Sequence, residues 1–379
     1  MKKKKAIHIV SDEKFIDAAI NNFSQTDFFE HHFYCLKKDG AIQHIRQTNK
    51  ITIVNSEKEI IALTNKEYQV VFLHSLFVIS ISYLLQIRKN IRIVWLSWGA
   101  DIYSDSTLCF IPPKLIHAPL FKDRTKKLGN IRTAKIFIKD ILRTLFPFPL
   151  WQYKKIVQRI DYISTVLPTE YTIIKERNNI KAQYFFFRYV SDISLWKPVV
   201  ISGNNILVGN SLDPTNNHID LLESLRTINI GEKRSLVLPL NYAGNNAYNA
   251  HLKKFISREK QLPILPLWKF MKSEEYFKLI ESCQYGIFGH IRQQAMGNIY
   301  QLLFNGAKIF MYEDSIAYSY LKSHGYYVYS IEKNLNSISI STPLSEEEKQ
   351  HNKNLYLTEM NRKIYLHKLN ESLKDIYLS

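Results

Sequence analysis

Short runs of β-branched and aromatic residues alternate along the chain with longer stretches in which apolar positions recur every three or four residues. The first pattern is typical of strands and the second of helices. Their regular alternation predicts parallel sheets with crossover helices. In the first half of the chain, the predicted strands are Lys5–Val10, His32–Leu36, Ile51–Val54, Gln69–Leu73, Ile91–Leu96 and Tyr162–Val166.

The second half repeats this pattern. Its predicted strands are Asn205–Val208, Ser235–Leu238, Tyr285–Phe288 and Lys308–Met311, and its helices lie near Asn216–Leu225, Asn246–Phe255, Ser273–Cys283 and Gln293–Phe304. Pro and Gly interrupt the periodicity at residues 196–205, which predicts a linker there. Residues 345–377 predict one or two further helices.

The apolar stretch Val70–Ile87 has about the minimum length of a membrane span, but it contains His74 and several Ser residues. We interpret it as a buried strand, a polar break at residues 74–75 and a helix closed by basic residues. The apolar run at residues 6–10 is too short for a signal peptide.

Length and composition predict the number of domains and the redox state of the compartment. A chain of 379 residues with 46% hydrophobic residues is too long for one small core and predicts two domains. The three cysteines, Cys35, Cys109 and Cys283, fit neither a disulfide framework nor a paired metal site. We therefore expect a reducing compartment.

The net charge of +17 is concentrated in one half of the chain. Residues 1–199 hold 31 Lys and Arg against 17 Asp and Glu, which leaves an excess of only 3 positive charges for residues 200–379. Residues 114–159 carry 12 basic against 2 acidic side chains and include Phe146, Phe148 and Trp151. Such a segment is attracted to an anionic membrane surface. A solvated basic face is the alternative.

The segment of residues 206–218 is a strand that leads directly into a small polar loop and then a helix. Gly209 lets the backbone approach a ligand closely, and Asn210 and Ser211 offer hydrogen-bond donors. The following helix would present free N–H groups to a diphosphate. A plain turn is the alternative.

A second transition from loop to helix follows the predicted strand Tyr285–Phe288. Arg292 stands at the start of a helix without other charges, where it could pair with a phosphate. A surface Arg without a ligand is the alternative. Between these two segments, Tyr242 could stack on a base or sugar and Asn245 could bind it, although an Asn here could equally cap a helix.

Polar residues also follow three of the strands in the first half. They are His8, Ser11 and Asp12 near the end of the first strand, His74 after the fourth and Asp101 after the fifth. An Asp at this edge of a sheet is a common general base for a sugar hydroxyl. Capping of the next helix is the alternative for Asp101, and a structural role is the alternative for His8.

No spacing of His, Cys, Asp or Glu in the sequence suggests a catalytic metal, and no Walker-type motif suggests a nucleotide hydrolase. We therefore expect no metal and no cofactor. Without a metal, the charge of a leaving diphosphate must be met by Arg292 and by helix N-termini.

Four segments spread over roughly residues 90–310 resemble, in order and spacing, the bacterial TDP-N-acetylfucosamine:lipid II N-acetylfucosaminyltransferases of enterobacterial common antigen assembly. The segments are Trp98–Tyr103, Ile206–Ser211 with Asn216 and His218, the stretch holding Pro239, Tyr242, Asn245 and Tyr248, and Arg292–Gln294 with Gly297.

The resemblance implies an α/β fold of the GT-B type, in which two Rossmann-like domains face each other across a cleft. The acceptor would bind the first domain, residues 1–199, and the nucleotide sugar the second, residues 200–345. Helices in residues 346–379 would pack back on the first domain. The implied enzyme is a metal-independent hexosyltransferase on the cytoplasmic face of the inner membrane.

The implied reaction moves a 4-acetamido-4,6-dideoxyhexose from a TDP-sugar to a saccharide on polyprenyl diphosphate. Asp101, His74 and Asp12 are the catalytic candidates, in that order, and His8, Ser11, Trp98 and Gly99 are expected on the acceptor side. The expected donor-binding residues are Gly209, Asn210, Ser211, Asn216, His218, Pro239, Tyr242, Asn245, Tyr248, Arg292, Gln293, Gln294, Gly297, Asn298 and Gln301.

Gln301 departs from related transferases, which carry a Glu at the corresponding place to bind the ribose hydroxyls. The departure suggests a nucleotide without a 2′-hydroxyl, such as TDP, although Gln could also bind an ordinary ribose.

Three alternatives remain open. A related GT-B enzyme could use another nucleotide deoxysugar for O-antigen or capsule. A nucleic-acid-binding protein would explain the charge, but the sequence holds no recognisable nucleic-acid-binding motif, and we expect no nucleic acid partner. A sugar-nucleotide-binding protein without catalytic activity is the third alternative.

Overall fold

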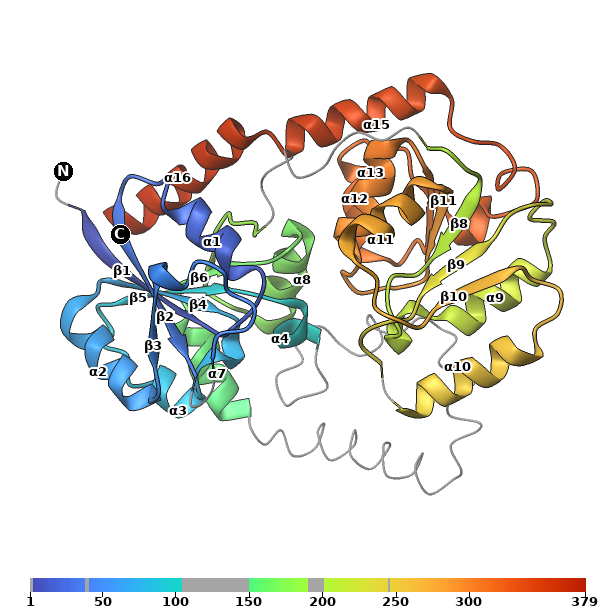
Figure 1. Ribbon diagram of the computed structural model, residues 1–379. Coiled ribbons are helices and arrows are strands. Elements are labelled where there is room, and N and C mark those ends of the chain that lie inside the picture. The colour runs from blue at the N-terminus through green and yellow to red at the C-terminus, as the bar shows by residue number, and fades with distance from the viewer. Residues whose placement is uncertain (1–2, 38–40, 104–149, 190–200, 245) are drawn as a thin grey trace. The chain divides into compact units, whose positions relative to one another are not determined.

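The computed structural model describes residues 3–37, 41–103, 150–189, 201–244 and 246–379 (Figure 1). These residues form two compact units. The first contains the described residues before 190 together with Met360–Ser379, and the second contains the described residues from 201 to Glu359. Each unit is built around one parallel sheet.

The first sheet has the strand order β3-β2-β1-β4-β5-β6-β7, and all of its pairs are parallel. The order reverses between β1 and β4, which are therefore the neighbours at the topological switch point of the sheet. The strands are β1 Lys4–Val10, β2 Phe29–Leu36, β3 Ile51–Val54, β4 Val70–His74, β5 Arg92–Leu96, β6 Tyr162–Ser164 and β7 Gln183–Tyr184.

Helices cover this sheet on both faces (Figure 1). They are α1 Ile16–Phe23, α2 Glu57–Glu67, α3 Ile81–Leu84, α4 Gly99–Tyr103, α7 Leu150–Arg159 and α8 Pro168–Asn178, with 3-10 turns η1 Thr48–Lys50 and η2 Leu76–Val78. The central strands read as continuous apolar runs because both of their faces are buried.

The C-terminal helix α16, Arg362–Leu378, packs on the first unit, as the resemblance implies. Its buried side chains recur every three or four residues and join the same core as Phe23 of α1. They are Tyr365, Leu369, Leu373 and Ile376. The preceding helix α15, Glu346–Glu359, instead packs against α12, Met296–Asn305, of the second unit. The prediction that residues 346–379 return to the first domain as a whole is therefore wrong for α15.

The second sheet has the order β10-β9-β8-β11-β12-β13 and is also entirely parallel, with its switch point between β8 and β11. The strands are β8 Asn205–Val208, β9 Leu236–Pro239, β10 Ile264–Leu267, β11 Cys283–Phe288, β12 Lys308–Met311 and β13 Tyr329–Ser330. The helices are α9 His218–Arg226, α10 Asn246–Arg258, α11 Ser273–Glu281, α12 Met296–Asn305, α13 Ile316–Ser323 and α14 Ile331–Asn334, with the 3-10 turn η6 Pro214–Asn216.

The stretch Val70–Ile87 begins with a buried strand, as predicted, but no continuous helix follows. Ser75 has a positive φ of 87°, its hydroxyl accepts a hydrogen bond from Phe77, and the chain forms the short turns η2 and α3 instead. Among the described residues, no helix is long and apolar enough to cross a membrane.

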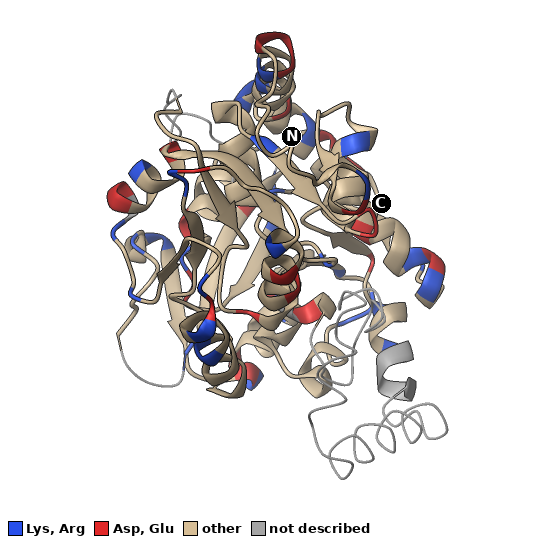
Figure 2. Ribbon diagram, turned by 90° about the vertical axis from the view of Figure 1, so that its right-hand side faces the viewer, with Lys and Arg blue, Asp and Glu red and all other residues tan. Residues whose placement is uncertain are grey.

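Lys and Arg are interspersed with Asp and Glu on the described helices in the face drawn in Figure 2. The basic segment of residues 114–159 lies outside the described residues except for α7. Half of the expected linker, residues 196–200, and Asn245 also lie outside them.

Candidate functional site

The loop after β8 is shaped by one glycine and one buried amide. Gly209 has φ of 68°, and a Cβ added there would come within 3.0 Å of the side chains of Asn216 and His218. The fully buried Asn216 accepts a hydrogen bond from the Asn210 N–H at 3.1 Å and donates to the Ser211 carbonyl at 3.0 Å. The loop is therefore rigid, and only Gly fits its first position.

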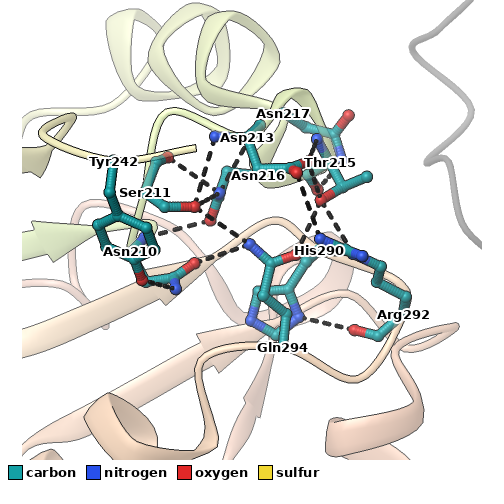
Figure 3. Close-up of polar contacts among 10 residues, drawn as sticks. All are labelled: Asn210, Ser211, Asp213, Thr215, Asn216, Asn217, Tyr242, His290, Arg292 and Gln294. Carbon is teal, nitrogen blue, oxygen red and sulfur yellow. Dashed lines mark hydrogen bonds and ion pairs between the residues drawn. The ribbon is translucent and has the colours of Figure 1, made fainter. Parts of the chain in front are cut away.

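The loop after β11 is tied to the loop after β8 through side chains (Figure 3). Arg292 Nε donates to Gln294 Oε1 at 2.9 Å, and Gln294 Nε2 donates to Asn210 Oδ1 at 2.8 Å. Asn210 Nδ2 donates in turn to the Tyr242 hydroxyl at 2.8 Å. Since β8 and β11 flank the switch point, this cluster lies at the carboxyl edge where open α/β sheets bind ligands.

Asp213, Thr215 and His290 belong to the same network, although sequence reasoning did not select them. Arg292 Nη2 pairs with Asp213 Oδ2 at 3.4 Å, and Arg292 Nε also donates to Thr215 Oγ1 at 3.2 Å. Asp213 caps the turn η6 by accepting from the Thr215 N–H. The Asp-Pro-Thr order after a strand is the signal that could have identified this cap.

His290 is fully buried, and its Nδ1–H donates to the Arg292 carbonyl at 3.1 Å. Burial lowers the pKa of His290 to about 3, so the ring is neutral at physiological pH. The hydrogen bond fixes the backbone that carries Arg292. No motif signals this residue, because its only cue in the sequence is its place after a strand.

Tyr242 and Gly297 are the most open of the expected donor-binding residues that the structure describes. Tyr242 is 53% exposed, and a Cβ added at Gly297 would meet no atom within 4 Å. Gly297 lies in the first turn of α12, whose N-terminal N–H groups have no partner within the helix. Gln293 lies in the same loop and is partly exposed.

Several expected donor-binding residues are buried and bond to other side chains. His218 Nδ1 and the Tyr248 hydroxyl lie 2.9 Å apart in the core, and Pro239 is a buried residue of β9. Asn298 donates to the Tyr276 hydroxyl at 2.9 Å, and Gln301 donates to Asn305 at 3.3 Å. Burial favours a structural role for His218, Tyr248 and Pro239, and their contact with a ligand stays a prediction.

In the first unit, the structure brings His8 and His74 together across the switch point. His8 Nδ1 and His74 Nε2 lie 2.9 Å apart, and both rings are fully buried. Trp98 packs against Tyr189 with ring centroids 5.9 Å apart. Ser11 and Gly99 are partly exposed at the same carboxyl edge.

Asp101 does not present its carboxylate at this edge. It is fully buried and accepts hydrogen bonds from the Leu76 N–H at 2.9 Å, the Trp95 indole at 2.6 Å and the Trp98 N–H at 2.7 Å. The last of these caps α4. Burial raises the pKa of Asp101 to about 6, against the opposing effect of these donors. The geometry therefore supports the capping role instead of the general base.

Asp12 also organises a loop. Its two carboxylate oxygens accept from the backbone N–H groups of residues 43–45 and from the Lys37 ammonium. Burial by itself would raise the pKa of Asp12, but these donors hold it well below its usual range. A carboxylate with so low a pKa and with both oxygens occupied is a poor general base, so the geometry favours a structural role for Asp12.

Among the described residues, no three His, Cys, Asp or Glu side chains gather in a way that could hold a metal ion.

Solved structures with the same fold include the sucrose-phosphate synthase of Thermosynechococcus elongatus, with a TM-score of 0.66, 8% identity, and coverage of 99% of this chain and 100% of that one. The Anabaena protein HepE, in complex with UDP-glucose, has a TM-score of 0.59, 12% identity, and coverage of 98% and 100%. AviGT4, a glycosyltransferase involved in avilamycin A biosynthesis, has a TM-score of 0.56, 8% identity, and coverage of 99% and 98%.

Two Rossmann-like units and these structural relatives show the GT-B fold, which confirms the expected fold class. A family model described as 4-alpha-L-fucosyltransferase, glycosyl transferase group 56, matches residues 152–343. The chain belongs to this family of enzymes. The resemblance found in the sequence is thereby confirmed.

Proposed function

We propose that this glycosyltransferase moves a 4-acetamido-4,6-dideoxyhexose from a TDP-sugar to a saccharide carried on polyprenyl diphosphate, at the cytoplasmic face of the inner membrane. The observation that carries the proposal is the cluster at the switch point of the second sheet, where Asn210, Gln294 and Arg292 join two loops in front of α12. The complex of HepE with UDP-glucose supports a nucleotide-sugar donor.

The diphosphate would lie over the first turn of α12. Its free N–H groups and the helix dipole favour an anion there, and the open space at Gly297 leaves room for one. Arg292 is partly exposed beside this turn, oriented by Asp213 and Gln294. As the bond to the sugar breaks, these groups would stabilise the charge that develops on TDP, a task performed elsewhere by a metal ion.

The preference for TDP rests on Gln301. This residue lies on α12, one turn from the C-terminal end at Asn305, and Gly306 terminates the helix with φ of 87°. A neutral amide in place of a carboxylate removes the acceptor that best binds two ribose hydroxyls. A nucleotide with deoxyribose therefore loses less binding affinity from this change than a nucleotide with ribose does.

The acceptor and the membrane surface are proposed from the sequence. The excess of ten positive charges in residues 114–159, next to Phe146, Phe148 and Trp151, is suited to an anionic leaflet in which a polyprenyl diphosphate is embedded.

The test is calorimetric titration of TDP and UDP into the wild-type chain and into Arg292→Ala. A charge-assisted hydrogen bond contributes about 1.5–3 kcal/mol, so TDP affinity should fall roughly ten- to 150-fold. TDP should bind more tightly than UDP to the wild-type chain.

Arg258→Ala is the matched control, because Arg258 is an exposed arginine of α10 in the same unit. It should leave TDP affinity unchanged. An Arg292→Ala variant that binds TDP as the wild type does would remove Arg292 from the site, and a wild-type chain that binds no nucleotide diphosphate would overturn the proposed function.

A further inference from the structure

An unbroken line of hydrogen bonds starts at Tyr189 and passes through three histidines of the first unit. The Tyr189 hydroxyl lies 2.9 Å from His74 Nδ1, and His74 Nε2 lies 2.9 Å from His8 Nδ1. His8 Nε2 lies 2.8 Å from His31 Nδ1. The three rings come from the adjacent strands β4, β1 and β2, so the line crosses the switch point of the sheet.

Thr26, at the end of the line opposite Tyr189, fixes the direction in which the hydrogen bonds are donated. His31 Nε2 lies 3.0 Å from Thr26 Oγ1, and the Thr26 hydroxyl lies 2.7 Å from the Phe23 carbonyl. A carbonyl only accepts, so the single Thr26 proton goes to Phe23, and Thr26 must accept from the Nε2–H of His31. His31 Nδ1 is then an acceptor.

The same reasoning passes from ring to ring, because a neutral imidazole carries one N–H. His8 donates from Nε2 to His31, His74 donates from Nε2 to His8, and the Tyr189 hydroxyl must donate to His74 Nδ1. The only proton on the Tyr189 oxygen therefore points into the protein. The lone pairs of this oxygen can accept from other donors, one of which is the neighbouring Trp98 side chain.

Packing keeps the rings neutral. His8 is stacked between Phe33 and Phe72, with ring centroids 4.1 and 4.5 Å away, and is fully buried. Burial lowers the pKa of His8 well below its ordinary value and that of His74 to about 3. A single direction for the whole line requires this neutrality, since an imidazolium would donate from both nitrogens.

Tyr189 lies where a ligand of the first unit would be bound. Its ring contacts Phe15, which follows β1, Trp98, which follows β5, and His74, which ends β4. All three positions are at the carboxyl edge of the sheet. Tyr189 is partly exposed, whereas His74 behind it is fully buried.

We propose that Tyr189 is a catalytic residue, which accepts the proton of the acceptor hydroxyl while it passes its own proton to His74. His8 and His31 are positioning residues, because they keep the His74 Nδ1 lone pair directed at Tyr189. The inference rests on the proposed function and adds to it the base that Asp101 and Asp12 do not provide.

The acceptor oxygen forms a bond to the anomeric carbon of the donor, and the bond from that carbon to the diphosphate oxygen breaks, with its electron pair leaving on TDP. The acceptor proton moves to Tyr189 Oη, and the tyrosine proton moves to His74 Nδ1. The imidazolium of His74 returns the proton through Tyr189 to water after the products leave.

A weak base is sufficient for this chemistry. When the new bond forms first, the acceptor oxygen becomes positively charged, and its proton is then far more acidic than that of an alcohol. The low pKa of His74 therefore delays the transfer until late in the reaction and keeps the His74 ring neutral in the free enzyme.

The test compares Tyr189→Phe with Tyr171→Phe. The Tyr171 hydroxyl donates to the Ala182 carbonyl at 3.0 Å in the same unit, so this control also loses one tyrosine hydrogen bond but lies outside the line. TDP release is measured with a panel of TDP-sugars and a disaccharide on a short polyprenyl diphosphate. We expect kcat to fall about 10²–10⁴-fold in Tyr189→Phe and to stay near the wild-type value in the control.

A second readout does not depend on turnover. In protein labelled with ¹⁵N-histidine, His8, His31 and His74 should all be neutral Nε2–H tautomers between pH 6 and 8. Thr26→Val removes the acceptor at the inner end and should disturb the His31 tautomer and lower kcat, whereas Thr26→Ser keeps the hydroxyl and should restore both.

Equal kcat values in Tyr189→Phe and Tyr171→Phe would overturn the proposal, as would an Nδ1–H tautomer or an imidazolium at any of the three rings. A wild-type chain that binds TDP but releases none from any TDP-sugar in the presence of the acceptor would instead contradict the proposed reaction, and the role of Tyr189 with it.

Discussion

A single buried carboxylate joins three segments of the first unit. Asp101 accepts from Trp95 of β5, from Leu76 in the turn after β4 and from Trp98 at the start of α4. Each of these donors is buried or half-buried, so each needs an acceptor within the protein. The position of α4 at the carboxyl edge of the sheet therefore depends on this side chain.

Asp101→Asn should destabilise the protein instead of only slowing the reaction. The amide NH₂ would replace one oxygen and face N–H donors, which leaves at least one buried donor without an acceptor, at a cost of about 1–3 kcal/mol. The free energy of unfolding is measured by denaturant titration at pH 7. Asp314→Asn, at an exposed aspartate of the second unit, is the control and should have no effect.

A stable Asp101→Asn variant with a collapsed kcat would contradict the capping role and restore Asp101 as the base.

At the scale of single elements, α12 holds a glycine for which the protein itself offers no reason. Gly297 is exposed, its φ is not in the left-handed region, and an added Cβ would meet nothing. Ala is preferred over Gly within helices by about 0.8–1.0 kcal/mol. A glycine in the first turn of this helix is explained if a ligand lies against it.

Gly297→Ala should therefore separate stability from binding. We expect an unchanged or higher melting temperature and a TDP affinity reduced roughly tenfold, equivalent to about 1.4 kcal/mol, because the methyl group intrudes on the diphosphate. Thermal unfolding and calorimetry measure the two effects.

Gly99→Ala is the matched control, since Gly99 begins α4 of the first unit and its Cβ would have an ordinary 3.7 Å contact with Tyr103. It should not change TDP affinity. Unchanged affinity in Gly297→Ala as well would place the diphosphate elsewhere.

At the scale of the whole molecule, both units keep histidines neutral in their interiors. Burial is the main cause in every case: it lowers the pKa of His8 well below its ordinary value, those of His31, His74 and His290 to about 3, and that of His218 to about 4. In the unfolded chain these rings would titrate near 6.5.

Acidification should therefore destabilise the protein. A group whose folded pKa is lowered contributes stability that is fully present above the unfolded value and is lost as the pH falls from about 6.5 toward the folded value. Asp101 and Glu170 act in the opposite direction, because burial raises their pKa values to about 6 and about 7, so their contribution is lost as the pH rises. Because the five histidines outnumber these two carboxyl groups, the net effect of a falling pH is a loss of stability.

The midpoint of thermal unfolding should thus fall between pH 7 and pH 5, and calorimetry in buffers of different ionisation enthalpy should show proton uptake on unfolding. A midpoint that stays constant or rises over this range would contradict neutral histidines in the folded state.

The sequence by itself determined the layers and the edge at which the site lies. Central strands such as β1 and β4 are buried on both faces, so they read as apolar runs that can be recognised without a structure. The strands that the pattern missed, β7, β10 and β13, are all at the edges of their sheets. Two of them, β7 and β13, have only two residues each. The third, β10, contains Pro266, which an edge strand tolerates because its outer side pairs with no other strand.

The tertiary structure alone decided which polar residues at that edge are open and which are enclosed. His8, Asp12, His74 and Asp101 have the same kind of position in the sequence, after or near the end of a strand. Their roles differ because distant segments supply their partners: the loop of residues 43–45 for Asp12, Leu76 and Trp95 for Asp101, and Tyr189 for His74. Burial and hydrogen bonding set the pKa of each group, and both depend on neighbours that are remote along the chain.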